Sequence, residues 1–506
     1  MNVIAMANGR EYANRGIMGA LCRLEVGELF LIDNEENPRQ EFPSLCAKCA
    51  QRYVNEELHA IDYSATLEGD NQIPIEPSLL AAFAPYLLTA VKMLERTQEE
   101  DIPFDERVHI IFTHLKYWNT IITRHDIGLY LGLDVPHGGY NYIIYALCKI
   151  HGIKTVFMQN CPVMGYSYPM NSIEENYPQI VGVYQKLTQE YEGVATEKIE
   201  LSKDFAAEYD RQAGADDKKV PYYMKDGSIK DHYRLVSKKE GGVKKAYKAF
   251  RHIASYALHP SMRGEIALNS DIQHNTRRYY EIWDSLVKPI DMVGERYIYF
   301  PLHLQPECTT TPQGGEFTWQ ILAVEILSRC LPDDVYIYVK ENPKQGIKAR
   351  SLHYPMDLAR IPHVKLVSHD TDTYSLIENS IAVATITGTA LWEGLWKGKN
   401  GIMFGSFITQ HAPGIFKVGN LKECQLAVDR ILQGGCAPTH RELKIFLKAM
   451  EQVTSFCFIS RAPLEKKYSM EQSAKGVENC LLRGVKDSGI EVKAEILQKE
   501  ERETTV

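Results

Sequence analysis

The feature that most limits how this chain can fold is an alternation of short apolar runs and helical segments in its C-terminal half. Each run is rich in branched and aromatic residues and ends near Pro, Gly, Thr or Asn. The runs are YIYFPL (297–302), VYIYVK (335–340), VKLV (364–367), IAVATI (381–386) and NGIMF (400–404). Helical spacing occurs between them, at 317–329, 374–379 and 390–397. Strands that alternate with helices predict a parallel sheet, so we expect a Rossmann-like domain here.

The N-terminal half repeats this pattern less clearly. Helical spacing covers residues 79–96, with Pro85 as a possible kink, and a second helix begins near Tyr140 and ends at Gly152. Strands are predicted at 28–33, 108–113, 127–133 and 154–159. The fold class that we expect is therefore α/β, with two Rossmann-like domains whose parallel sheets face an interdomain cleft.

The length of 506 residues supports this division, because single cores rarely grow beyond about 250–300 residues. We expect an N-terminal Rossmann-like domain, a basic loop with a linker helix, a C-terminal Rossmann-like domain, and a helical segment with a tail. The predicted bounds are 1–217, 218–290, 291–460 and 461–506.

The charge of the chain is unevenly spread. The net charge is −8, but the segment from Lys218 to His252 holds nine lysines and two arginines against three acidic residues. Its excess of +8 leaves −16 on the remainder, so no overall basic footprint for nucleic acid exists. The segment is read as a solvated loop or, alternatively, as a site for an anionic membrane surface or a polyanionic acceptor.

Cysteine usage and hydropathy favour a cytoplasmic location, with the inner face of the cytoplasmic membrane as the alternative. The 11 cysteines are scattered, which is typical of reduced thiols, and Cys46 and Cys49 lack a second ligand pair, so no metal site is expected. No uninterrupted apolar stretch approaches about 18 residues, and the N-terminus lacks the pattern of a signal peptide.

Polar residues gather where the predicted strands end. Thr387, Gly388 and Thr389 lie between a buried strand and a helix, where hydroxyls and free amides form an anion site. Glu393, in the helix that follows, could accept hydrogen bonds from ribose hydroxyls. The plainer readings are that Thr387 caps this helix and that Glu393 is solvated.

Other strand ends carry candidate acid–base groups. His303 and Glu307 lie on a Pro-stiffened loop, and Asp134 and His137 occupy the matching turn of the N-terminal half. A carboxylate and an imidazole facing a cleft are suited to general acid–base catalysis or, for a carboxylate, to nucleophilic attack. Asp134 could instead cap the helix after it, and the His303 pair could be structural.

Four motifs, in this order, resemble the bacterial capsule polysaccharide biosynthesis family, whose members are similar to Kdo (3-deoxy-manno-octulosonate) transferases of GT-B architecture. They are YIYFPLHLQPECTTTPQGG (297–315), VYIYVKENPKQ (335–345), VKLVSHDTDTYSLIENS (364–380) and VATITGTALWEGLWKGKNGIMFG (383–405). The segment 134–159 is also similar to that family's N-terminal half. The resemblance covers roughly residues 108–165 and 295–420.

The resemblance implies a metal-independent glycosyltransferase with no cofactor, which would bind a nucleotide sugar, a CMP-linked 2-keto sugar acid, on its C-terminal domain. Lys340, Glu341, Asn342 and Pro343 stand where the family has Lys-Glu-His-Pro, so Asn342 replaces a histidine and cannot carry its proton. The turn 387–389 would hold the donor phosphate, and Glu393 the ribose.

By the same resemblance, the sugar would be transferred to a glycan or lipid-linked acceptor in surface polysaccharide assembly. Two alternatives stay open. One is a sugar-nucleotide epimerase of the same fold, and the other is a non-catalytic component of the assembly machinery. An epimerase needs no acceptor groove, so the large N-terminal half favours a transferase.

Overall fold

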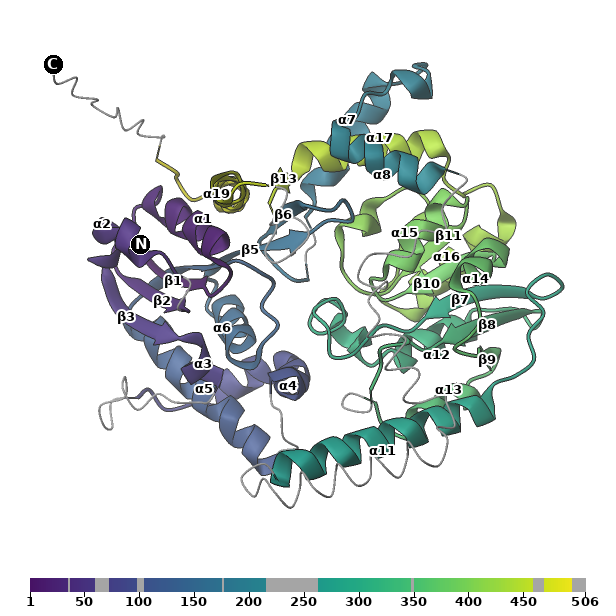
Figure 1. Cartoon of the computed structure of the whole chain (residues 1–506), viewed down its shortest axis with the longest axis horizontal. Helices are drawn as coiled ribbons and strands as arrows, with labels where there is room; N and C mark the ends of the chain where they lie inside the picture. Colours follow the sequence, from purple (N-terminus) through teal and green to yellow (C-terminus); the bar gives the residue numbers. More distant parts are fainter. Residues whose placement is uncertain are drawn as a thin grey trace, which may run out of the picture.

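The computed structural model describes residues 1–34, 37–59, 72–97, 104–174, 177–214, 263–346, 350–457 and 468–493. The basic segment from Lys218 to His252 lies outside these residues, so the predictions about it are not addressed by the structure. The described chain forms two α/β halves, each built around its own sheet (Figure 1).

The C-terminal sheet has six strands, which are all parallel, in the order β12-β11-β10-β7-β8-β9. The order reverses direction between β7 and β10, the doubly wound arrangement of a Rossmann fold. The strands are β7 (Arg296–Pro301), β8 (Val335–Lys340), β9 (Val364–Leu366), β10 (Ala382–Thr385), β11 (Asn400–Met403) and β12 (Ile415–Lys417). The helices among them are α12 (Ile321–Arg329), α13 (Tyr354–Arg360), α14 (Thr373–Asn379), α15 (Thr389–Trp396) and α16 (Leu421–Gln433).

The N-terminal sheet has seven strands in the order β13-β6-β5-β4-β1-β2-β3, of which β1 to β5 are parallel. Its order reverses between β1 and β4. The strands are β1 (Asn2–Ala7), β2 (Leu29–Asp33), β3 (Cys49–Val54), β4 (Ile127–Gly132), β5 (Lys154–Asn160), β6 (Tyr166–Met170) and β13 (Ser455–Phe456). Its helices include α1 (Glu11–Cys22), α2 (Pro43–Cys46), α3 (Asn55–His59), α4 (Pro77–Thr97), α5 (Phe104–Arg124) and α6 (Gly139–Ile150). Two parallel sheets of Rossmann-like order confirm the predicted fold class.

One strand prediction was wrong. Residues 108–113 (VHIIFT) are part of helix α5, not a strand. The buried side chains of this region recur at Ile111, Leu115, Trp118 and Ile122, a spacing of three or four residues that a six-residue window does not reveal. Strand β1, in contrast, was not predicted. Its residues Val3 to Ala7 are all buried, and it lies inside the sheet between β4 and β2.

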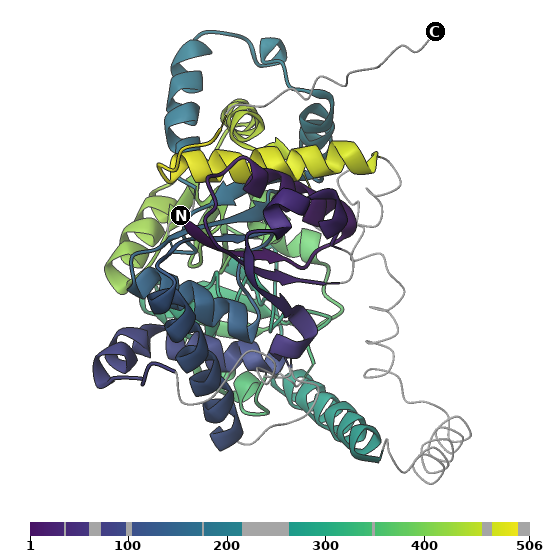
Figure 2. The same cartoon turned by 90° about the vertical axis from the view of Figure 1, so that its left-hand side faces the viewer.

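The C-terminal part of the described chain returns to the N-terminal half. Helix α17 (His440–Val453) packs on α7 (Gln179–Glu190), with α8 (Lys203–Ala213) nearby. Strand β13 then pairs antiparallel with β6, and α19 (Met470–Asp487) lies across α1 (Figure 2). In the sequence, the C-terminal half therefore lies between two segments that both belong to the N-terminal half. The predicted boundary at residue 460 stays a prediction.

Helix α4 is the one described helix that is long and apolar enough to span a membrane. Its window Pro77–Leu94 has a mean hydropathy of 1.4, and 22% of the window is buried. The search for about 18 uninterrupted apolar residues did not identify α4, because Thr89 and Lys92 interrupt its apolar run.

The two halves are in contact at several places among the described residues. The amide of Ile408 donates to the hydroxyl of Tyr168 at 3.2 Å. The indole N–H of Trp392 donates to Oε1 of Glu208 on α8 at 3.3 Å. Lys92 of α4 lies over the ring of Trp319, 5.2 Å from its centre.

Candidate functional site

The carboxyl ends of strands from the two sheets meet at one place. Asp134 and His137 follow β4, Cys308 follows β7, and one ligand atom from each lies within 4.8 Å of the other two. β4 and β7 each border the point where the strand order of their sheet reverses, which is where open α/β sheets bind ligands. The two predicted catalytic residues of the N-terminal half therefore face the C-terminal half.

The turn after β4 is ordered by its own side chains. Oδ1 of Asp134 accepts the amide of Val135 at 2.8 Å, and Nδ1 of His137 lies 2.5 Å from the carbonyl oxygen of Val135. His137 Nδ1 is also 3.9 Å from Oδ2 of Asp134. The N-cap of α6 is Gly138, so Asp134 does not cap that helix.

His303 is buried at the end of β7. Its Nε2 lies 2.6 Å from the hydroxyl of Thr385 and accepts the amide of Thr387 at 3.3 Å. Burial, together with the positive charge of Arg350, lowers the pKa of His303 to about 3. The ring is thus neutral at physiological pH and ties the turn after β10 to the loop after β7. Glu307 of the same loop is half-buried and precedes Cys308.

In the turn between β10 and α15, one threonine side chain is buried and hydrogen-bonded and another is exposed. The hydroxyl of Thr387 donates to the carbonyl oxygen of Thr309 at 2.7 Å, while Thr389 is exposed as the first residue of α15. The helix cap is Gly388, not Thr387. A Cβ on Gly388 would lie 2.9 Å from both His303 Nε2 and Thr385 Oγ1, so the turn requires glycine for close packing.

Lys340, at the end of β8, is directed to the start of α14. Its ammonium donates to the carbonyl oxygen of Thr371 at 2.5 Å and to the hydroxyl of Thr373 at 3.0 Å. Burial lowers the pKa of Lys340 to about 8, against the opposing influence of Asp372 and Asp370. The ammonium group of Lys340 is therefore unusually acidic, and it loses its positive charge near pH 8.

Glu341, which the sequence places with the donor-binding residues, lies inside a buried ion pair. Its Oε2 is 3.3 Å from Nε of Arg350, and both side chains are fully buried. The Tyr279 hydroxyl donates to the same oxygen. Arg350 also donates to the carbonyl oxygen of His303 at 2.8 Å and to Gln305. The pair thereby holds the loops after β7 and β8 together.

Asn342 and Pro343 form the turn beyond this pair. The Asn342 amide donates to Oε1 of Glu341 at 2.8 Å, and its side-chain oxygen accepts the amide of Lys344 at 3.0 Å. Asn342 thus stabilises its own turn through a bond from a backbone amide to its side-chain oxygen, an acceptor that a histidine lacks. Whether the stretch 340–343 contacts a donor stays a prediction.

Glu393 of α15 lies near the α8 residues Glu208 and Arg211. Burial and the neighbouring Glu208 raise the pKa of Glu393 to about 7, while Arg211 opposes the shift. Arg211 itself forms a forked pair with Glu208, at 2.8 and 2.6 Å. The carboxyl of Glu393 is half-buried, and its raised pKa brings its change of charge near neutral pH.

Two polar residues of this region were missed from the sequence. Arg350 carries no motif signal, because its partners are recognisable only in the folded chain. Gln313 is 2% exposed, and its Nε2 has no hydrogen-bond partner among the described residues. It lies on the loop that contains Cys308, whose thiol is 3.9 Å from Gln313 Oε1. The one feature of the sequence that could have drawn attention to Gln313 is the Pro/Thr/Gly composition of its loop.

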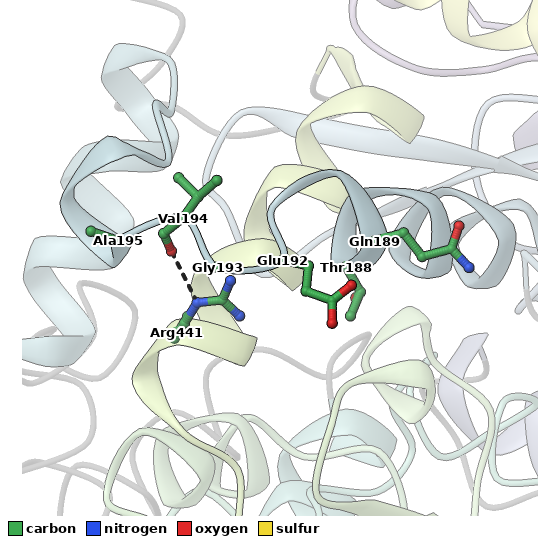
Figure 3. A pocket seen from close by; sticks show the side chains of 7 residues that line it. All are labelled: Thr188, Gln189, Glu192, Gly193, Val194, Ala195 and Arg441. Carbon is green, nitrogen blue, oxygen red and sulfur yellow. Dashed lines mark hydrogen bonds between the residues drawn. The ribbon is translucent and has the colours of Figure 1, made fainter.

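A separate pocket of about 550 Å³ lies at the outer end of α7, lined by Thr188, Gln189, Glu192, Gly193, Val194, Ala195 and Arg441 (Figure 3). Arg441 of α17 donates to the carbonyl oxygen of Val194 at 3.3 Å and to that of Tyr191. An arginine at the C-terminal end of a helix is a common structural cap. None of the predicted site residues lines this pocket.

Comparison with known proteins gives structural matches alone: no family model and no curated protein matches the chain. One match is the beta-Kdo 2,7 transferase KpsC from Thermosulfurimonas dismutans, with 10% identity, a TM-score of 0.28, and coverage of 78% of this chain and 96% of that one. Another is the UDP-GlcNAc 2-epimerase from Methanocaldococcus jannaschii, with 10% identity, a TM-score of 0.26, and coverage of 96% and 100%. A glycosyltransferase from Rickettsia africae has 11% identity, a TM-score of 0.23, and coverage of 96% and 97%.

A Kdo transferase is thus among the proteins to which the chain is similar.

Proposed function

We propose that this protein is a glycosyltransferase of surface polysaccharide assembly. It would transfer a sugar, Kdo or a related ulosonate, from a CMP-linked donor to a glycan or lipid-linked acceptor. The observation that supports this most is the meeting of two strand-order reversal points, because each is the ligand position of its own Rossmann-like sheet. A donor and an acceptor that react with each other could each occupy one such position.

The donor phosphate would lie at the turn 387–389. The N-terminus of α15 lies at this turn and favours an anion, and the exposed Thr389 adds a hydroxyl, while the amides of Thr387 and Gly388 already donate to His303 Nε2 and Thr385 Oγ1. Thr387, whose hydroxyl is engaged with Thr309, would shape the turn. The fixed donors would stabilise charge on the departing nucleotide phosphate, which is a large term in such reactions.

The acceptor hydroxyl would lose its proton to a carboxylate or an imidazole near the turn after β4. Asp134, His137 and Glu307 are the candidates. His303 is less suited to this step, because its Nε2 is engaged and its pKa of about 3 makes it a weak base. Attack by a carboxylate on the anomeric carbon, which would give retention, is the alternative course.

Nucleotide binding tests the donor site. CMP should bind the wild-type protein in calorimetry, and Thr389→Val should weaken binding about tenfold through loss of one hydrogen bond to a charged phosphate. Thr387→Val should act through the shape of the turn and lower thermal stability as well. Binding that is unaltered in both variants would contradict the phosphate site.

Turnover tests the reaction class. A panel of sugar nucleotides, with CMP-Kdo first, should show transfer to a glycan acceptor, and Asp134→Asn or Glu307→Gln should reduce it by about 100-fold or more. Wild-type rates in both variants would exclude these carboxylates. Epimerisation of UDP-GlcNAc without an acceptor would favour the epimerase, and binding without any turnover would favour the non-catalytic alternative.

Peripheral membrane contact through the basic segment from Lys218 to His252 is proposed on charge alone. Binding to anionic liposomes should weaken with added salt, because the charges of such a contact are screened. Liposome binding that survives deletion of the segment would contradict this role.

A further inference from the structure

The three side chains that meet between the halves have the chemistry of a metal site. Asp134 offers a carboxylate oxygen, His137 an imidazole nitrogen, and Cys308 a sulfur, all within 4.8 Å of one another. All three are half-buried, so an ion could reach them from solvent. Sequence spacing did not predict a metal site, because Cys308 lies 171 residues after His137 and belongs to the other half.

We propose that Asp134, His137 and Cys308 bind a zinc-class divalent cation. Carboxylate, imidazole and thiolate are all ligands of Zn²⁺, and three protein ligands leave a fourth position open for water or another ligand. Thiolate makes the site selective for such a metal over Mg²⁺ or Ca²⁺, which prefer oxygen ligands alone. The proposal concerns this ion and does not depend on the proposed transferase activity; with Asp134 and His137 on the ion, Glu307 would be the base of that reaction.

The support around His137 fits this role. Its Nδ1 lies 2.5 Å from the carbonyl oxygen of Val135. A hydrogen bond from one ring nitrogen to a backbone carbonyl fixes the tautomer and leaves the lone pair of the other nitrogen for the metal. For the carbonyl of Val135 to give this outer support, Nε2 must be the ligand atom, because Nδ1, which also lies 3.9 Å from Asp134 Oδ2, is the N–H donor to the carbonyl.

The distances require a small approach of the two halves. Bond lengths of about 2.0–2.3 Å in a tetrahedral site place ligand atoms roughly 3.3–3.8 Å apart. The ligand atoms lie within 4.8 Å, so they would need to approach by at most about 1.5 Å. Because Asp134 and His137 belong to one half and Cys308 to the other, the bound ion would link the halves and favour their closed arrangement.

Cobalt substitution tests the site without any nucleotide or sugar. The chelator-treated full chain is titrated with Co²⁺, and absorption is followed in the near-ultraviolet, where thiolate–cobalt charge transfer appears, and in the visible. The expected result is saturation at one equivalent, with displacement by Zn²⁺. Cys308→Ser should abolish the charge-transfer band, whereas Asp134→Asn and His137→Ala should keep it with an affinity at least tenfold lower.

Cys436→Ser is the matched control, because Cys436 is a half-exposed cysteine of the C-terminal half whose thiol is 3.2 Å from Asn400 Oδ1. It should leave the titration unchanged. Zn²⁺ should also raise the melting temperature of the wild type and not that of Cys308→Ser, whose circular dichroism checks its folding. A wild type without the charge-transfer band, or a Cys308→Ser variant that keeps it, would overturn the proposal.

Discussion

His303 and Glu393 show how burial changes what an ionisable side chain can do. Both flank the turn that follows β10, and both have lost most of their contact with water. For His303 the charged form is disfavoured, and its pKa falls to about 3; for Glu393 the charged form is also disfavoured, and its pKa rises to about 7. The histidine is consequently fixed in its neutral form, whereas the carboxyl changes charge within the physiological range.

Gly388→Ala should damage the turn that the donor is proposed to contact. The added Cβ would lie 2.9 Å from His303 Nε2 and from Thr385 Oγ1, so one of these groups must move. We expect a loss of about 1–3 kcal/mol of unfolding free energy and at least tenfold weaker CMP binding. Urea unfolding and calorimetry measure the two effects.

Gly182→Ala is the control for this substitution. Gly182 lies in α7, with no heavy atom within 4 Å of an added Cβ. Alanine in a helix should raise stability by about 0.5–1 kcal/mol and leave nucleotide binding unchanged. Equal effects of the two substitutions would show that the contacts at Gly388 are unimportant.

Glu393→Gln should change how stability depends on pH. The folded-state pKa of about 7 is above the ordinary 4.5, so ionisation costs folding free energy. That cost is absent below about pH 4.5, grows as the pH rises, and is complete above about pH 7. The variant should therefore be more stable than the wild type at pH 8, by on the order of 2–3 kcal/mol, and similar to it at pH 4. Urea unfolding at several pH values would contradict this if the difference between the two proteins were constant.

The place of a residue in the fold was predictable where it stands at a strand end, and not where its partner is distant in sequence. Asp134, His137, His303 and Thr387 were identified from the turn after a buried strand. That Glu341 is enclosed by Arg350 could not be seen, because a buried ion pair depends on three-dimensional packing. Cys308 was missed as a neighbour of Asp134 for the same reason.

At the scale of elements, five of the six strands of the C-terminal sheet were predicted to within one residue at each end, because buried parallel strands are continuous apolar runs between turn residues. The short edge strand β12 was not predicted. The helix α5 was misjudged in part, since its window of isoleucine, valine and phenylalanine has high strand propensity. Packing along one face of a 21-residue helix outweighs that local preference.

The ends of β7 and β8 should separate when their buried ion pair is broken. Arg350→Met leaves the carboxylate of Glu341 buried without its partner and removes the hydrogen bond to the His303 carbonyl oxygen. The expected loss is about 3–5 kcal/mol of unfolding free energy, measured by urea denaturation. The double variant with Glu341→Gln should recover part of it.

The exposed pair of Arg277 and Glu281, at 2.9 Å, provides the comparison. Arg277→Met should change stability by less than about 0.5 kcal/mol, because solvent screens such pairs. A loss for Arg350→Met as small as this would mean that the buried pair does not hold the two loops.

At the scale of the whole molecule, the N-terminal half is completed by residues from the other end of the described chain. Val477 of α19 packs so closely on α1 that a Cβ on Gly16 would lie 2.6 Å from its Cβ. Val477, Cys480 and Leu481 belong to the same apolar cluster as the core of β1. This return was not predicted, because α19 has the pattern of an ordinary amphipathic helix.

Gly476→Ala should loosen this return. The added Cβ would lie 1.8 Å from the carbonyl oxygen of Phe456, so α19 and β13 cannot both keep their places. We expect a loss of about 1–3 kcal/mol of unfolding free energy and faster amide exchange in β6, which pairs with β13. Unchanged exchange in β6 would show that α19 adjusts without disturbing the sheet, and Gly182→Ala again serves as the control.

The return of α19 to α1 also sets an order of events during synthesis. Gly16 and Val477, which touch in the folded protein, are separated by 461 positions. At about 5–20 residues per second, α1 leaves the ribosome roughly 20–90 s before its partner helix. During that interval the apolar surface of α1 is uncovered while the second half is being made. The newly made chain should therefore depend on chaperones to a greater extent than its two compact halves suggest.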